Sequence, residues 1–361
     1  MNNIKQNPER SPAYLKIYKQ VREDIINGLY PYMTKLPSKR SMSDRLGVST
    51  VTIEHAYALL CDEGYAEARE RSGFVVIFKQ SDGFAAAEST PSRHIRAVGT
   101  EHSQFPFSAL AKTMRRVITD EGEGLLSRSE NTGIAELREA ISRYLARSRG
   151  IIASKEQIVI GSGSEYLYSL IVELFGRNKT FAIESPSYKK IEQVYKACEV
   201  KIEMLPLGNE GIEGEALWRS NADILHISPY RSYPSGVTAS ASKRHEYIKW
   251  GARGERWLVE DDFESEFTLS RKHNETLFSL TESDNVIYMN SFSKTISPSL
   301  RVGYMVIPER LVPVFSQKLG FYSCTVPTYI QLVVAQLIEN GDFERHINRT
   351  RRKLRQALRD K

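Results

Sequence analysis

The sequence predicts an α/β protein of at least two domains: a small N-terminal helical module and a larger domain built around a mostly parallel central sheet. The chain has 361 residues, of which 41% are hydrophobic, and a chain of that length usually forms more than one core. Amphipathic stretches dominate the first 79 residues. Beyond residue 103, short apolar runs alternate with longer amphipathic stretches, which is typical of βα units around a parallel sheet covered on both faces.

The first domain, residues 11–79, has the pattern of a winged helix-turn-helix. Apolar side chains recur at helical spacing in its first stretch, and Gly28 marks the end of that helix. Gly47 supplies the turn between the second and third helices, and Ser49 or Thr50 caps the third. The expected elements are helices over residues 14–26, 41–46 and 50–62, followed by a hairpin of residues 66–69 and 74–78.

The larger domain is expected at residues 104–340, after a linker. Residues 80–103 are rich in Ser, Ala, Gly and Pro and carry few large apolar side chains, which is typical of a linker. In the larger domain the expected strands are residues 158–160, 181–183, 224–227, 257–259 and 286–288, and the expected helices are residues 165–175, 189–198 and 239–250.

Charge, cysteine content and hydropathy exclude several classes of protein. The net charge is +6, but residues 344–361 carry eight basic and two acidic side chains, so the rest of the chain is close to neutral. We expect that segment to be a solvated helix face rather than a DNA-binding arm. The three cysteines lie far apart in the sequence, with no CxxC motif and no histidine-rich segment near them, so we expect small buried thiols and no metal site. No apolar run is long enough for a membrane span and the N terminus lacks a secretory pattern, so we expect a cytoplasmic protein with no membrane partner.

The third helix of the first domain carries the candidates for reading double-stranded DNA. A helix-turn-helix sets this helix in the major groove, where its N-terminal residues reach base edges. We expect Val51, Tyr57 and Leu60 to pack inward. The residues expected to contact DNA are Ser49, Thr50, Thr52 and His55 on this helix, Lys39 and Arg40 on phosphates before it, and Arg69 and Arg71 in the wing.

Motifs in the same residues resemble the GntR-type regulators. Residues 36–40 read LPSKR, residues 46–49 read LGVS and residues 56–64 read AYALLCDEG. The resemblance covers residues 12–76 and implies binding to double-stranded DNA; a three-helix protein-interaction module is the alternative. Many members of the family have arginine where this chain has Thr50, so the resemblance does not extend to the operator sequence.

A second set of residues is typical of a site for pyridoxal 5′-phosphate (PLP). PLP needs an amine, donors for its phosphate, an acid beside the pyridine nitrogen and a flat apolar partner for the ring. Lys294 follows an apolar strand and supplies the amine. The residues expected to hold phosphate are Ser291, Ser293 and Arg301, together with Gly163, Ser164 and Glu165 at the N-terminal end of a helix.

The acid and the ring partner have candidates as well. Asp261 comes directly after the strand of residues 257–259, at the carboxyl end where α/β sheets place their ligands. Neighbouring Asp262 alternates to the other face, so Asp261 is the expected partner of the pyridine nitrogen. Tyr188 is the expected ring-stacking residue, and a tyrosine that only forms a turn is the alternative.

Taken in order, these motifs resemble the fold-type I aminotransferases. The resemblance is closest to the MocR branch of the GntR regulators, in which such a domain follows the winged helix. It runs from about Phe105 to the C terminus and includes GIAELR at residues 133–138, YPSG at residues 233–236 and EDDFESEF at residues 260–267. The resemblance implies a fold-type I, PLP-dependent domain and a homodimer.

The resemblance also assigns roles to individual residues. It implies that Lys294 is the Schiff-base lysine and that Asp261 pairs with the pyridine nitrogen. Lys190 lies where relatives often have an arginine that contacts the ligand, and Arg128 lies where a tyrosine of the other subunit usually reaches the phosphate. We therefore expect Lys190 to contact an effector and Arg128 to contact the phosphate across the subunit interface.

Several positions depart from the family pattern. Phe263 stands where relatives have a tyrosine that hydrogen-bonds the cofactor's phenolic oxygen, and residues 229–232 read PYRS where relatives usually have His-Gln. Only 67 residues follow Lys294. Residues 341–361 are expected to begin a small C-terminal subdomain, whose later part supplies an arginine for the substrate carboxylate in the family. We therefore expect a C-terminally truncated member in which finished transamination is disfavoured.

The expected function is a transcriptional regulator whose aminotransferase-like domain senses PLP or a PLP adduct of a small amine or amino acid. Binding would shift the dimer between two arrangements and so alter how its paired winged helices meet operator half-sites. Two alternatives remain open: an active PLP-dependent aminotransferase, and a PLP-free regulator that uses the large domain only to dimerise.

Overall fold

The chain forms two compact units, which divide between Val98 and Gly99. The computed structural model describes residues 12–69, 72–79, 105–263, 265–267 and 275–359. The expected linker, residues 80–103, and Arg71 of the expected wing lie outside the described residues. Each unit has its own hydrophobic core, so the two are described separately.

The N-terminal unit is a winged helix-turn-helix. Gly47 ends its second helix in the left-handed conformation, which glycine adopts without steric cost, and Ser49 caps the third helix by accepting a hydrogen bond from the backbone N–H of Thr52. Ser38 caps the second helix, which therefore begins at Lys39, two residues earlier than expected. The elements are α1 (Ala13–Ile26), α2 (Lys39–Leu46), α3 (Thr50–Asp62), β1 (Ala66–Arg69) and β2 (Gly73–Val76).

The core of this unit decides which face of α3 is exposed. Ile53, Tyr57 and Leu60 turn inward and are buried with residues of α1 and α2. Val51 precedes Ile53 by two positions and therefore points to the opposite side of the helix. Its side chain is 57% exposed, so the expectation that Val51 packs inward is wrong.

The larger unit is built on a sheet that has eight strands within the described residues. All the neighbouring pairs from β9 to β5 are parallel, whereas β10 runs antiparallel to both of its neighbours and the short β6 runs antiparallel to β5. The sheet is therefore mostly parallel, as expected. Its order is β3 (Ile158–Gly161), β10 (Gly303–Val306), β9 (Val286–Ser291), β8 (Trp257–Asp261), β7 (Ile224–Ile227), β4 (Thr180–Ser185), β5 (Lys201–Gly208) and β6 (Gly211–Ile212).

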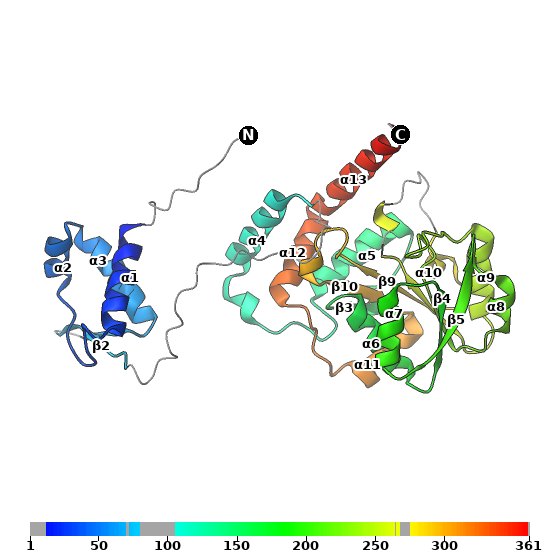
Figure 1. Cartoon of the computed structure of the whole chain (residues 1–361), viewed down its shortest axis with the longest axis horizontal. Helices are drawn as coiled ribbons and strands as arrows, with labels where there is room; N and C mark the ends of the chain where they lie inside the picture. Colours follow the sequence, from blue (N-terminus) through cyan, green and yellow to red (C-terminus); the bar gives the residue numbers. More distant parts are fainter. Residues whose placement is uncertain (1–11, 70–71, 80–104, 264, 268–274, 360–361) are drawn as a thin grey trace. The chain divides into compact units, whose positions relative to one another are not determined.

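Helices cover both faces of this sheet because alternate residues of each buried strand point to opposite sides (Figure 1). Val259 and Met289 face one side, where α6 (Ser164–Phe175), α7 (Lys189–Ala197) and α11 (Val312–Leu319) pack. Leu258 and Tyr288 face the other side. The helices on that side are α4 (Phe107–Glu121), α5 (Ala135–Arg149), α8 (Gly214–Arg219), α9 (Ala241–Gly251), α10 (Leu277–Leu280), α12 (Thr328–Glu339) and α13 (Asp342–Arg359).

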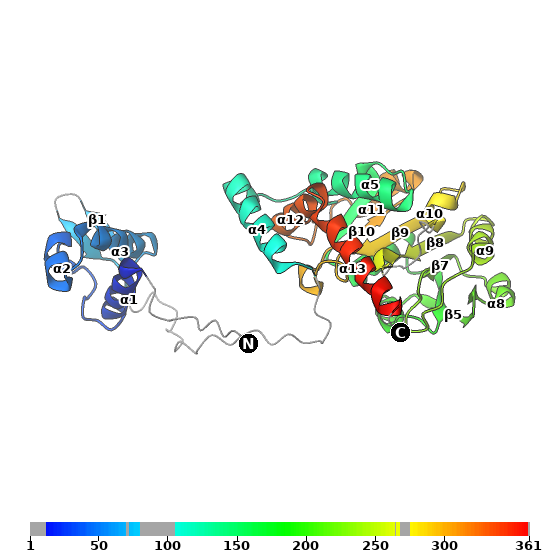
Figure 2. The ribbon, with the colours of Figure 1, turned by 90° about the horizontal axis from the view of Figure 1, so that it is seen from above.

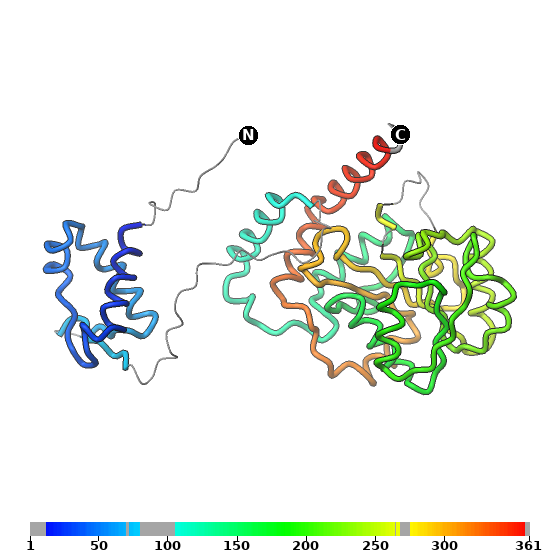
Figure 3. Tube along the Cα trace, viewed as in Figure 1, coloured from blue at the N-terminus to red at the C-terminus, as the bar shows by residue number. Residues whose placement is uncertain are grey.

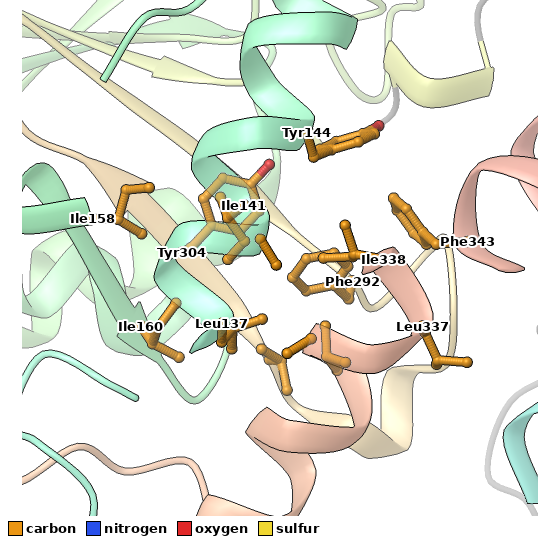
Figure 4. Close-up of a cluster of buried hydrophobic side chains, with 14 of the residues drawn as sticks. Leu137, Ile141, Tyr144, Ile158, Ile160, Phe292, Tyr304, Leu337, Ile338 and Phe343 are labelled. Carbon is orange, nitrogen blue, oxygen red and sulfur yellow. The ribbon is translucent and has the colours of Figure 1, made fainter. Parts of the chain in front are cut away.

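The last part of the chain returns to the helices that open the unit. Figures 1 and 2 both show α12 beside α4, and the trace in Figure 3 shows the two segments running together although they are distant in sequence. Phe343 of α13 points toward Tyr144 and Phe292 in Figure 4, with ring centroids 5.3 and 5.5 Å away. The first turns of α13 therefore pack against the rest of the large unit, with Phe343 and Ile347 buried.

Two further expectations concern the surface. No helix in the described ranges is long and apolar enough to cross a membrane. The cysteines Cys61, Cys198 and Cys324 are free thiols and are half-buried rather than buried.

Candidate functional site

A cavity of about 340 Å³ lies at the carboxyl ends of the parallel strands. Its walls come from segments that directly follow β3, β4, β7, β8 and β9, which is where open α/β sheets place ligands. Its volume lies within the range of small-molecule sites. The residues that line it are Ser164, Glu165, Tyr168, Tyr188, Lys190, Tyr233, Phe263, Ser291, Ser293, Lys294, Pro298 and Arg301.

Most of the residues expected from the sequence meet in this cavity. Two expected residues adjoin it without lining it: Gly163 lies against the guanidinium of Arg301, and Asp261 accepts a hydrogen bond from the lining residue Tyr168. Arg128 does not line the cavity; its guanidinium donates to Asn131 at 2.9 Å and to Ser323 at 2.7 Å. The expected residues that line the cavity are Ser164, Glu165, Tyr188, Lys190, Ser291, Ser293, Lys294 and Arg301.

Gly163 and Arg301 form one wall at the N-terminal end of α6. Gly163 has a φ of +100°, and a Cβ added to it would lie 2.7 Å from Arg301 Nη2. Only glycine therefore lets the guanidinium approach this backbone. The first N–H groups of α6 and the positive end of its dipole add to the guanidinium, so the wall is suited to a phosphate.

Glu165 adds a negative charge to the wall that Gly163 and Arg301 form. Its Oε2 accepts from Arg301 Nη2 at 2.8 Å, and its Oε1 accepts from Lys190 Nζ at 2.6 Å. Partial burial raises the pKa of Glu165, but the two cations outweigh it and lower this pKa to about 2. The carboxylate is ionised near neutral pH and neutralises part of the charge of Lys190 and Arg301.

Asp261 ends a buried chain of polar groups. Tyr168 of α6 donates to Asp261 Oδ2 at 2.5 Å, and His226 Nε2 lies 3.5 Å from the same oxygen. His226 Nδ1 pairs with the Tyr195 hydroxyl at 2.6 Å, while Nε2 is buried without a hydrogen-bond partner among the described residues. Burial raises the pKa of both Tyr168 and Tyr195, so these phenols stay neutral.

The adjacent Asp262 lies on the opposite face of β8, as alternation along a strand requires. It is fully buried and pairs with Arg149 Nε at 3.0 Å, and Tyr288 donates to it at 2.7 Å. Arg149 also lies 3.6 Å from Glu266, and burial raises the pKa of this carboxyl. Asp262 therefore belongs to a structural charge cluster beneath α5, away from the cavity.

Aromatic side chains form the remaining walls. The rings of Tyr188 and Phe263 are nearly parallel, with an interplanar angle of 19° and centroids 6.4 Å apart, and Tyr233 meets Tyr188 edge-on. Ser232 donates to the buried Glu184 of β4 at 2.6 Å, which ties the segment before Tyr233 to the sheet. Burial raises the pKa of Glu184 to about 7, although the hydrogen bond from Ser232 opposes this.

The described DNA candidates come from the first turns of α3, the start of α2 and the strand β1. Thr50 and His55 are exposed, and the ring of His55 lies edge-on to Tyr14 of α1 at 5.9 Å. The hydroxyls of Ser49 and Thr52 bond to each other at 2.8 Å, so they complete the cap of α3. Of the expected cations, Arg40 is exposed, Lys39 pairs with Glu54 at 2.7 Å and Arg69 pairs with Glu67 at 3.0 Å.

Sequence reasoning missed several residues in and around these two sites. Tyr168 follows Ser164 by one helical turn, so helical periodicity could have placed it beside the cavity. His226 of β7 lies beside Asp261, and Glu184 of β4 accepts from Ser232. No local pattern marks either residue. Glu54 on α3 faces Lys39 of α2, and only the packing of the two helices shows this pair. In the described ranges no group of three or more His, Cys, Asp or Glu side chains could hold a metal ion.

Comparisons with known proteins match both units. Residues 13–76 match the family of bacterial regulatory proteins of the gntR type, and residues 98–361 match the aminotransferase class I and II family. In solved structures, the chain is similar to a kynurenine aminotransferase of Pyrococcus horikoshii, with a TM-score of 0.63 and 24% identity over 69% of this chain and 64% of that one. LysN, an α-aminoadipate aminotransferase of Thermus thermophilus, gives a TM-score of 0.61 and 27% identity over the same shares, 69% and 64%.

Curated relatives extend over both units. The chain is 31% identical to the HTH-type transcriptional regulator YdeL of Bacillus subtilis, over 94% of this chain and 76% of that protein. It is 29% identical to a protein of Rhizobium meliloti named probable rhizopine catabolism regulatory protein MocR, over 94% of this chain and 74% of that protein. The chain therefore belongs to the MocR subfamily of GntR-type transcriptional regulators, which join a GntR DNA-binding domain to an aminotransferase class I and II domain.

Proposed function

We propose that this regulator binds PLP in the cavity and that occupancy of the cavity changes how its winged helices engage double-stranded DNA. The observation that carries the proposal is the convergence of Lys294, Arg301 and the Asp261–Tyr168 pair on one cavity of suitable volume. Lys294 follows β9, Arg301 lies in the turn before β10, and Asp261 and Tyr168 come from β8 and α6. The large domain as a whole is therefore needed to assemble them.

The residues present fit PLP in three respects. The Gly163 backbone, Ser164 and Arg301 offer donors and positive charge for the phosphate, with Ser291 and Ser293 beside them. Asp261 is a buried acid that could hold a protonated ring nitrogen. Tyr188 and Phe263 present flat apolar surfaces to the ring.

The side chains also define what the site would do. PLP, when bound, supplies an electrophilic aldehyde carbon and an electron-accepting ring. Lys294 would hold the cofactor covalently through Nζ, and the buried phenols around Asp261 would keep its carboxylate in place. Phe263 has no hydroxyl to offer the ring, which favours a sensing role over turnover.

An effector would meet Lys190 at the cavity wall. Lys190 is exposed and is held 2.6 Å from Glu165, so the pair presents both a cation and an anion to a small amine or amino acid. Such an effector would react with the cofactor aldehyde in place of Lys294. We propose that this exchange is the sensed event.

A homodimer would bring two winged helices to two operator half-sites. Exposed apolar side chains on the large unit support self-association: Leu126 is 88% exposed and Phe107 is 77% exposed. Arg128 follows Leu126 by two residues, so a second copy covering this surface could receive Arg128 at its phosphate site. Since its DNA partner is inside the cell, the proposed location is the cytoplasm.

The first experiment tests the lysine. PLP is titrated into wild-type protein, the Lys294→Ala variant and the Lys190→Ala variant, and the visible absorbance is followed before and after borohydride reduction. We expect reduction to attach the cofactor to the wild type and to Lys190→Ala but not to Lys294→Ala. Lys190 is the matched control, because it is another lysine of the same cavity. Unchanged absorbance in Lys294→Ala would refute the assignment.

The second experiment separates the three possible functions. DNA affinity is measured with and without PLP, and amino-group transfer to a keto acid is measured in parallel. A sensor shows a PLP-dependent DNA affinity that Lys294→Ala abolishes, and an aminotransferase turns over an amino donor. A regulator that shows neither PLP binding nor turnover would use its large domain only for self-association.

A further inference from the structure

The recognition helix α3 lacks the side chains that make bidentate contacts with bases. Its sequence, TVTIEHAYALLCD, contains no Arg, Lys, Asn or Gln. Arg and Lys make the bidentate contacts to guanine, and Asn and Gln make those to adenine. A DNA-binding domain with this helix must therefore discriminate bases by other contacts from α3.

The exposed face of α3 has an apolar centre. Glu54 turns toward α2, where Lys39 holds it at 2.7 Å, and His55 turns toward α1, where it meets the ring of Tyr14. Viewed down the helix axis, Val51 and Ala58 point in directions between those of Glu54 and His55, and both are exposed. Val51 is in the first turn of α3, at the end that enters the groove in helix-turn-helix proteins.

We propose that Val51 is a base-reading residue that contacts the 5-methyl group of thymine in the major groove. Among the features that base pairs display there, this methyl group is the one that an aliphatic side chain can recognise. Lys39 keeps the nearby carboxylate of Glu54 paired, and Arg40 is exposed at the start of α2, so phosphates could be held on this side.

The flanking charges favour DNA over a protein partner for this surface. An exposed valine in a protein interface usually lies within a larger apolar patch, whereas Val51 follows the exposed Thr50 and has Glu54, which pairs with Lys39, one turn further along the helix. Val51 also lies near the N-terminal end of α3, where the positive end of the helix dipole favours a phosphate. The apolar contact would supply specificity, and the charges would supply general affinity.

The test uses the full chain and duplexes selected from a random-sequence pool. In the selected consensus each thymine is replaced in turn by deoxyuridine, which removes only the 5-methyl group. We expect one thymine in each half-site at which this replacement weakens binding about fourfold, the value for one buried methyl group. In Val51→Ala the same replacement is expected to have no effect, because the contact is already lost.

Controls separate this readout from damage to the domain. Val51→Ala should keep the fold, since the side chain is exposed and alanine favours helix, and circular dichroism checks this. Leu29→Ala removes another exposed apolar side chain of the same unit, 66% exposed and outside α3, and should leave the deoxyuridine effect unchanged. The proposal is overturned if Val51→Ala retains the deoxyuridine effect, if no consensus is enriched, or if Val51→Ala alters self-association instead of DNA binding.

Discussion

Replacing Arg149 with methionine is expected to destabilise the large unit by about 3 kcal/mol, because it leaves the carboxylates of Asp262 and Glu266 buried without their cation. The Arg149 side chain is 5% exposed, and those of Asp262 and Glu266 are 0% and 4% exposed. Methionine fills much of the same volume, so the loss reports on charge rather than on a cavity.

The magnitude follows from what remains after the substitution. Removing one partner of a buried ion pair usually costs about 3–5 kcal/mol. Tyr288 still donates to Asp262 at 2.7 Å, and Asn290 still donates to Glu266 at 2.8 Å. Burial already raises the pKa of Glu266, so this carboxyl can take up a proton. The two hydrogen bonds and the protonation of Glu266 reduce the loss in the free energy of unfolding. The expected value therefore lies at the lower end of the range.

Urea denaturation followed by tryptophan fluorescence measures the effect. All three tryptophans, Trp218, Trp250 and Trp257, lie in the large unit, so the signal is specific to it. Arg147→Met is the matched control: this arginine is on the same helix, but its ion pair with Glu344 is exposed and contributes at most about 1 kcal/mol. Equal losses in the two variants, or a loss below about 1 kcal/mol in Arg149→Met, would refute the reasoning.

Three further predictions concern Gly163 and Glu165 at the cavity and the buried Glu184 of β4. Gly163→Ala should weaken PLP about tenfold while leaving pyridoxal unaffected, because the added Cβ meets the Arg301 guanidinium; equal losses for both ligands would exclude a phosphate-specific role. Glu165→Gln should tighten PLP about tenfold relative to pyridoxal, because the carboxylate no longer competes for Arg301, and an unchanged ratio would contradict this. Glu184 binds a proton in the folded state up to a pKa of about 7 but releases it near 4.5 when unfolded, so stability falls as pH rises through that window. Glu184→Gln should reduce this fall, measured by denaturation at about pH 5 and about pH 8; an identical pH dependence would contradict the shift.

Local patterns located many elements of the fold. The expected strand of residues 224–227 coincides with β7, and the expected helices over residues 14–26, 165–175 and 189–198 differ from α1, α6 and α7 by one residue at an end. Strands β5 and β10 were not expected. β10 has only four residues, both of its neighbours run antiparallel to it, and one of them, β3, is distant in sequence. Its place therefore depends on pairing that no local pattern encodes.

The candidate cofactor site was located by residue type and by position after a strand. Lys294, Arg301 and Ser164 could be placed because the carboxyl ends of parallel strands meet at one edge of the sheet. The sequence did not reveal that Glu165 bonds to both Arg301 and Lys190, since those partners come from segments 136 and 25 residues away. Whether these residues bind PLP stays a prediction.

The sequence by itself determined the secondary-structure patterns of the two domains and the opposite directions of the Asp261 and Asp262 side chains. It also determined which residues are candidates for the PLP site. These three features depend on the periodicity of apolar residues along a helix or strand, on capping residues, or on the position of a residue relative to one strand. Only the tertiary structure decided that Val51 is exposed and that Tyr168 and His226 surround Asp261. The physical reason is that burial and pairing depend on which elements pack together, and these elements meet across long separations in the chain.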